Sequence, residues 1–276
     1  MHVTDELVLA DLITFLCCVL WTVDKFHSPQ NLCLALTGEI GELAEIFQWK
    51  GSINGKPYKE VLKDTEMIHL GEEITDVFVY TIRLCDECHI NIPAAISTIL
   101  HGNELSMDGC ILTNSSCWSE LSFVEVLNLI KQHPISNLVH KPRDVIFRII
   151  ANIGGIAPLF MSMNDIHQEA HSSNSNSTIH SELSSESIYK REAWLFHGNW
   201  DDEQLKLVVS SLAHILISCS ILCLYADLEL ASIVRDKMIK NNNKYPVDLV
   251  KGKSGKYTDY IEVIQARTGG GNINQN

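Results

Sequence analysis

The chain has 276 residues, of which 46% are apolar, 7% aromatic and 20% charged, so it can bury a substantial core and is neither a disordered polymer nor a small disulfide-stapled domain. Lys and Arg number 21 against 34 Asp and Glu, a formal net charge of -13. This balance argues against a nonspecific nucleic-acid binder, because phosphate contacts need a basic face. It suits a soluble protein or one that gathers cations.

The cysteines and the N-terminal segment indicate the compartment. The nine cysteines run from Cys17 to Cys223, an odd number in a long chain, and predict free thiols in a reducing, cytoplasmic environment. The apolar residues 7–21 contain Asp11 and follow Asp5 and Glu6, where a secretory signal carries Lys or Arg. We therefore expect a first helix there and not a leader peptide.

The apolar spacing predicts an all-α fold. Most periodic segments have helical spacing, and no series of alternating five-residue runs bounded by turn residues is present in the sequence. A helix is expected to start near Pro29 and to face a core with one stripe of side chains: Leu32, Leu36, Ile40, Leu43 and Phe47.

Residues 207–225 carry no formal charge and are long enough to cross a membrane. Several serines and His214 dilute the segment, and no Lys or Arg cluster lies close enough to set an orientation. We favour a helix buried inside a bundle, and expect no membrane partner.

The chain shows an internal repeat. Residues 26–29 (FHSP) are echoed 113 residues later by residues 139–142 (VHKP), and the same offset matches Ile40 with Ile153 and Phe47 with Phe160. A later helix, residues 74–96, follows the pattern of residues 212–234 at an offset of 138. The offsets differ by 25 residues, which a polar, serine-rich stretch at about 164–193 accommodates as a disordered insertion. The two halves are predicted to be a tandem duplication.

The first half carries two pairs of carboxylates. Glu39 with Glu42, and Glu73 with Asp76, are spaced at i and i+3, which places each pair on one face of a helix. Such acids repel one another when brought together, and a hard divalent cation such as Mg²⁺ relieves the repulsion. The alternative is two solvated acidic faces. The surrounding apolar residues favour acids at faces that pack together.

These segments resemble a known family. Residues 26–32 (FHSPQNL), 36–50 (LTGEIGELAEIFQWK) and 72–77 (EEITDV) are similar to the dCTP pyrophosphatase branch of the all-α, MazG-like NTP pyrophosphatases. Residues 237–246 (KMIKNNNKYP) and 256–258 (KYT) resemble the closing motifs of that family.

The resemblance implies Mg²⁺-dependent hydrolysis of a nucleoside triphosphate to a monophosphate and pyrophosphate. Glu39, Glu42, Glu73 and Asp76 would hold the metal. The implied substrate contacts are His27, Trp49, Tyr80, Lys237, Asn241 and Tyr245. Simpler roles compete for three of them: Trp49 as a core anchor, His27 as a helix-entry cap and Lys237 as an exposed cation.

The second half has lost the acids. At the repeat offsets the four ligand positions are occupied by Asn152, Gly155, Ser211 and His214, and Pro158 is expected to interrupt the corresponding helix. The first half lacks the Lys–Asn–Tyr ending. We therefore expect two halves, residues 1–110 and 111–262, followed by a flexible tail at 263–276. The halves are expected to pack as a pseudo-dimer with one composite site. Whether the pseudo-dimer associates with a second copy is left open.

Two departures from the family pattern concern the substrate. Thr14 and Val23 stand where the family carries a His and a Trp for the base, and Ile239 replaces an acidic residue of the tail motif. Cytosine preference is therefore an expectation from overall similarity. The alternative function is a nucleotide-binding or scaffolding protein that has lost turnover.

Two shorter motifs are set aside. Cys85, Cys88 and His89 fit a haem-attachment pattern but lack an export context, and as a zinc site they lack an evident fourth ligand. Glu66 and His69 form a Glu-x-x-His, but a di-iron site needs a second such motif, which Glu39 and Glu42 do not supply.

Overall fold

The computed structural model describes residues 28–105, 110, 123–161 and 200–244, and the described residues contain helices and no strand. The helices are α2 (Pro29–Gln48), α3 (Tyr58–Val61), α4 (Asp64–Glu87), α5 (Ile92–Leu100), α7 (Phe123–Gln132), the 3-10 helix η2 (Pro134–His140), α8 (Pro142–Met161), α11 (Asp202–Ala226) and α12 (Leu230–Lys244). The all-α prediction is confirmed for this part of the chain. The proposed insertion at 164–193 and the tail at 263–276 lie outside it.

Helix α2 begins and packs as its sequence predicts. Ser28 caps it by accepting a hydrogen bond from the backbone N–H of Asn31 at 3.3 Å, and Pro29 occupies the first turn. The five apolar side chains of the expected stripe are all buried. The stripe therefore faces the core.

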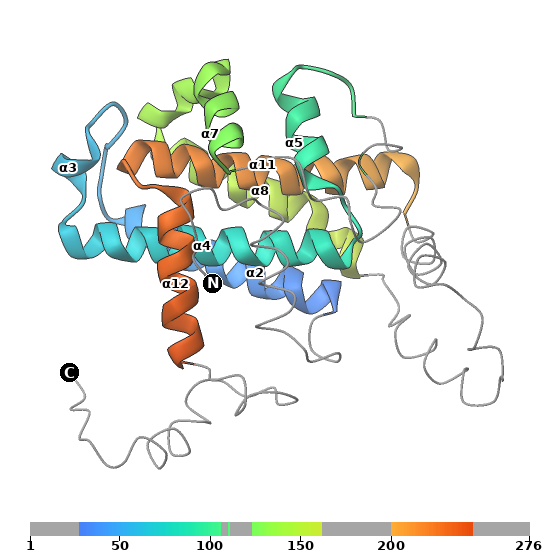
Figure 1. Cartoon of the computed structure of the whole chain (residues 1–276), viewed down its shortest axis with the longest axis horizontal. Helices are drawn as coiled ribbons and strands as arrows, with labels where there is room; N and C mark the ends of the chain where they lie inside the picture. The colour runs from blue at the N-terminus through green and yellow to red at the C-terminus, as the bar shows by residue number, and fades with distance from the viewer. Residues whose placement is uncertain (1–27, 106–109, 111–122, 162–199, 245–276) are drawn as a thin grey trace, which may run out of the picture.

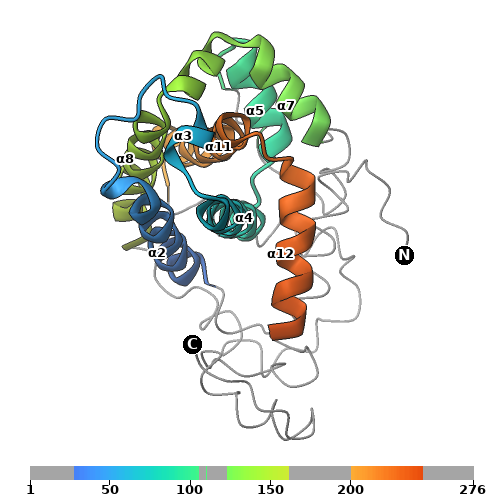
Figure 2. The same cartoon turned by 90° about the vertical axis from the view of Figure 1, so that its left-hand side faces the viewer.

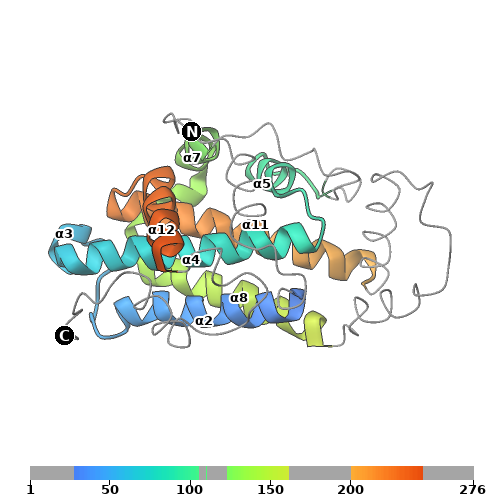
Figure 3. The same ribbon diagram turned by 60° about the horizontal axis from the view of Figure 1, so that its bottom comes forward.

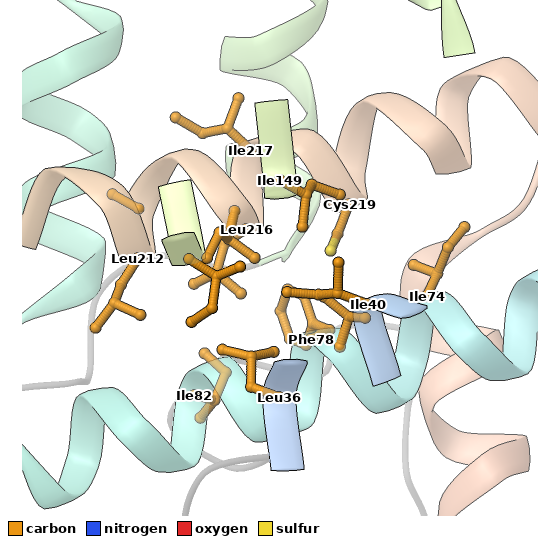
Figure 4. Close-up of a cluster of buried hydrophobic side chains, with 14 of the residues drawn as sticks. Leu36, Ile40, Ile74, Phe78, Ile82, Ile149, Leu212, Leu216, Ile217 and Cys219 are labelled. Atoms are coloured by element: carbon orange, nitrogen blue, oxygen red, sulfur yellow. The ribbon is translucent and has the colours of Figure 1, made fainter. Parts of the chain in front are cut away.

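The four long helices α2, α4, α8 and α11 lie side by side and form the body of the molecule (Figures 1 and 3). Figure 4 shows their shared core, with Leu36 from α2, Phe78 from α4, Ile149 from α8 and Leu216 from α11 meeting in one apolar cluster. One core thus joins the two parts of the chain that the repeat relates.

Helix α11 is buried along most of its length by α8, α4 and α5. Its N-terminus has a capping box, in which Asp201 accepts from the backbone N–H of Gln204 at 2.8 Å. Helices α8 and α11 are both long and apolar enough to span a membrane, a test that core helices of soluble proteins also pass. The expected burial of α11 within a bundle is confirmed.

The expected break at Pro158 is wrong, because α8 runs through this residue to Met161. Pro158 is exposed and lies in the last turn of the helix, four residues after the exposed Gly154. At such a position the carbonyl that loses its intrahelical hydrogen bond can bond to water, which makes the proline tolerable.

The helix bounds follow the two repeat offsets. Helices α2 and α8 each have 20 residues and start 113 residues apart, and α4 and α11 start 138 residues apart. The packing also repeats, since α2 lies along α4 as α8 lies along α11.

Two of the shorter helices, α5 and α12, each pack on a long helix other than the one that precedes them in the chain. Helix α5 follows α4 in the chain but packs on α11, whereas α12 follows α11 but packs on α4 (Figure 2). This exchange places α12, at the end of the described chain, against α4, which carries Glu73 and Asp76.

Candidate functional site

Three carboxylates converge where α2 faces α4. Glu39 and Glu42 lie one turn apart on α2, and Glu73 faces them from α4. One oxygen from each lies within 4.8 Å of the others. Glu42 is exposed, Glu39 is half-buried and Glu73 is buried, so the cluster opens to solvent on one side.

Burial and mutual repulsion raise the pKa values of two acids in the cluster, Glu39 and Glu73. Burial raises the pKa of Glu39 to about 7, and the charges of Asp76, Glu42 and Glu73 add to the effect, while Lys237 opposes it. Burial also raises the pKa of Glu73, with Asp76 the next cause. The arrangement therefore favours either bound protons or a bound cation.

Asp76, the fourth predicted ligand, lies next to the cluster in an ion pair with Lys237 of α12. Burial raises the pKa of Asp76, and the hydrogen bond and charge of Lys237 oppose the rise. The Lys237 side chain is only 11% exposed. The alternative that Lys237 is merely an exposed surface cation is therefore wrong.

A second ion pair joins the same two helices. Lys240 of α12 donates to both carboxylate oxygens of Glu72 on α4, at 2.6 and 2.8 Å. The close approach needs a small residue, since a Cβ on Gly71 would lie 3.3 Å from the Ile233 side chain. Gly71 thus allows α12 to reach the acids.

The remaining predicted substrate residues are placed in part. Tyr80 is half-buried on α4, one turn after Asp76, and Asn241 is half-buried on α12, one turn after Lys237. Trp49 ends α2 and is 87% exposed, so its alternative as a core anchor is wrong. His27 and Tyr245 lie outside the described residues.

The structure adds contacts that the motif does not reveal. His69, one turn before Glu73 on α4, lies with its Nδ1 3.2 Å from the Glu73 carboxylate Oε1. Glu66 instead pairs with Lys50 at 2.8 Å, away from the cluster. The Glu-x-x-His spacing was visible in the sequence, but it did not show that its two members point to different partners.

The donor set suits a hard divalent cation. Glu39, Glu42 and Glu73 offer only oxygen, and the Oε2 atom of Glu73 is buried with no hydrogen-bond partner in the described structure. In the described part of the chain, Glu39, Glu42 and Glu73 form the group of three or more potential metal ligands whose ligand atoms lie close together. Cys85 and Cys88 are buried in the core, where burial raises the pKa of both thiols.

The chain is similar to named proteins over about a third of its length. It is 37% identical to dCTP pyrophosphatase 1 of Rattus norvegicus over 94 residues, which are 34% of this chain and 54% of the relative. It is 44% identical to dCTP pyrophosphatase 1 of Homo sapiens over 73 residues, 26% of this chain and 42% of the relative. The chain spans about half the length of the curated relatives it matches, and this confirms the resemblance to that branch over the matched part.

No family model matches the chain, and no solved structure matches it.

Proposed function

We propose that the chain is a nucleotide pyrophosphohydrolase that cleaves dCTP, or a related pyrimidine deoxynucleoside triphosphate, to the monophosphate and pyrophosphate. The observation that carries the proposal is the convergence of Glu39, Glu42 and Glu73 in a chain similar to dCTP pyrophosphatase 1. Its role would be to clear unwanted nucleotides from the cytoplasmic pool.

Mg²⁺ is the proposed cofactor, held by Glu39, Glu42, Glu73 and Asp76. When bound, it supplies charge neutralisation at the triphosphate and activation of water. His69 orients Glu73 for this task. Burial and, after it, repulsion by the neighbouring acids raise the pKa of Glu39, and a bound cation would relieve the repulsion.

Lys237 and Lys240 supply positive charge to the triphosphate, and Asn241 lies one turn beyond Lys237 on the same helix. Trp49 offers an exposed ring to the nucleotide, and Tyr80 a wall of its pocket. His27 and Tyr245 complete the proposed substrate set.

The site is composite in sequence, because its acids come from α2 and α4 and its lysines from α12. We propose that this reflects a tandem duplication whose halves pack as the subunits of a dimer would. The equal lengths of α2 and α8, the two repeat offsets and the exchange of α5 and α12 support this origin.

The proposed activity is tested by pyrophosphate release from canonical and modified deoxynucleoside triphosphates in Mg²⁺. We expect release by the wild type and a loss of at least about 100-fold in kcat/KM in Glu42→Gln, since removing one transition-state charge contact costs about 3 kcal/mol. Glu45→Gln is the matched control, because Glu45 is exposed on the same helix and lies outside the cluster. No release from any nucleotide, with nucleotide binding retained, would favour the non-hydrolysing alternative.

The composite site has its own test. Lys237→Ala and Asn241→Ala should each lower kcat/KM if α12 serves the acids of α2 and α4. An unchanged kcat/KM in both variants, with Glu42→Gln inactive, would show that the acids work without the second half.

A further inference from the structure

The acid cluster has a counterpart in the fold where α8 packs along α11, as α2 packs along α4. At the repeat offsets, its positions hold Asn152 and Gly155 on α8 and Ser211 and His214 on α11. The counterpart has therefore exchanged four carboxylates for neutral groups. These four residues cannot hold a metal ion as four carboxylates would, but they leave room for a negatively charged ligand.

Arg148 adds a positive charge to this place. It lies one turn before Asn152 on α8, and the side-chain amide of Asn152 donates to its backbone carbonyl at 2.7 Å. Burial lowers the pKa of His214, and the charge of Arg148 lowers it further, so the two side chains are close enough to interact across the two helices. His214 is therefore neutral at neutral pH and can donate from one ring nitrogen.

Both side chains keep a buried polar atom without a partner. The Nε atom of Arg148 and the Nδ1 atom of His214 make no hydrogen bond within the described structure. Asp144 lies one turn before Arg148, and no ion pair joins the two within the described ranges. Buried polar atoms are nearly always paired in folded proteins, so the two orphaned nitrogens indicate that the described structure lacks a partner for these side chains.

We propose that Arg148 and His214 form an anion site that binds a phosphate group. The planar fork of an arginine matches phosphate oxygens, and a neutral histidine adds a donor without requiring protonation. Asn152, one turn after Arg148, has a second amide N–H beyond the one that bonds to the Arg148 carbonyl, and this group is a further donor. Arg148 and His214 are each partly exposed, so a ligand can reach other atoms of these side chains from solvent, whereas Arg148 Nε and His214 Nδ1 are enclosed and meet the ligand only after the side chains rotate.

The site does not depend on turnover at the acid cluster, so it can be tested without an activity assay. The full chain is titrated calorimetrically in EDTA with inorganic phosphate, pyrophosphate or dCTP. Binding of phosphate alone assigns a simple oxyanion site, whereas binding only of dCTP assigns a nucleotide site. We expect at least tenfold weaker affinity for the bound probe in Arg148→Gln, and unchanged affinity in Lys131→Gln, which removes an exposed cation of α7 that belongs to neither site.

Folding is controlled by comparing the thermal unfolding of Arg148→Gln, Arg148→Lys and His214→Asn with that of the wild type. Arg148→Lys keeps the charge but loses the fork, and should fall between wild type and Arg148→Gln in affinity. If Arg148→Gln does not fold, His214→Asn carries the test. No binding of any of the three probes, or equal affinity in the wild type and a folded Arg148 or His214 variant, would overturn the proposal.

Discussion

The protonation of Glu39 links the stability of the fold to pH and to a bound cation. Its pKa rises from the ordinary 4.5 to about 7, so between these values the folded protein holds a proton that the unfolded chain has released. Without metal, this group therefore stabilises the fold at low pH and loses that contribution as pH rises towards 7. A metal ion reverses the preference, because it binds the ionised form.

We predict that in EDTA the free energy of unfolding falls by about 1–2 kcal/mol between pH 4.5 and 7 through this group, allowing for its partial exposure. Urea unfolding at a series of pH values measures the fall. Glu39→Gln should flatten it, and Glu45→Gln should not. A slope that is the same in Glu39→Gln and wild type would contradict the assignment.

The acids could be proposed from sequence because their i and i+3 spacing places each pair on one face of an otherwise apolar helix, but the convergence of Glu39 and Glu42 with Glu73 is visible only in the structure. Lys237 was proposed only through the family resemblance, because no local sequence signal predicts that a lysine on α12 pairs with Asp76 on α4. The contact between His69 and Glu73 was missed because an i,i+4 pair on a helix is usually a solvated surface pair. Arg148 was missed because its environment, not its spacing, distinguishes it.

At the scale of the helix, the position of α12 on α4 decides whether the lysines reach the acids. The contact passes over Gly71, whose missing side chain leaves room for Ile233. A larger residue at this point pushes the two helices apart. The ion pairs made by Lys237 and Lys240 lie along the same contact and would lengthen with it.

We predict that Gly71→Val lowers kcat/KM for pyrophosphate release at least tenfold and destabilises the fold by about 1–3 kcal/mol through overpacking. Gly38→Ala is the control, because a Cβ at Gly38 meets nothing within 4 Å, and it should gain up to about 1 kcal/mol by helix propensity. Steady-state kinetics and urea unfolding check both variants. Full activity in Gly71→Val would mean that α12 does not position the site.

The start of α2 at Pro29 and its buried stripe were predictable from the proline and the apolar periodicity, whereas its cap was not, since Ser28 and not His27 caps the helix. The continuation of α8 through Pro158 was not predicted. Proline breaks an average helix interior, but Pro158 lies in the exposed last turn of this helix. The packing of α5 on α11 and of α12 on α4 was not predicted, because no local signal in the sequence shows which long helix a short helix will cover.

The molecule as a whole is held by one core to which α2, α4, α8 and α11 all contribute (Figure 4). Leu216 of α11 is buried in this cluster with Leu36 of α2 and Phe78 of α4. The described helices within residues 1–110 and within residues 111–262 therefore bury apolar surface against each other in one shared core.

We predict a single cooperative unfolding transition for the described core, and a loss of about 2–5 kcal/mol in Leu216→Ala. Calorimetry should give equal calorimetric and van't Hoff enthalpies for the wild type. A fragment of residues 1–110 should show no cooperative melting by circular dichroism. Two resolved transitions, or a fragment that melts cooperatively, would show that the halves are independent.

The ion pair of Lys237 with Asp76 joins two ends of one polypeptide, separated by 161 positions in the sequence. A site shared between separate chains is lost on dilution, whereas groups tethered in one chain meet at a local concentration that the amount of protein does not change. Tethering also frees each half to vary alone, because a substitution on one side of the molecule is not copied to the other. In the proposed duplication, one half can then keep the acids while the other keeps the lysines, and each molecule still carries the whole proposed site.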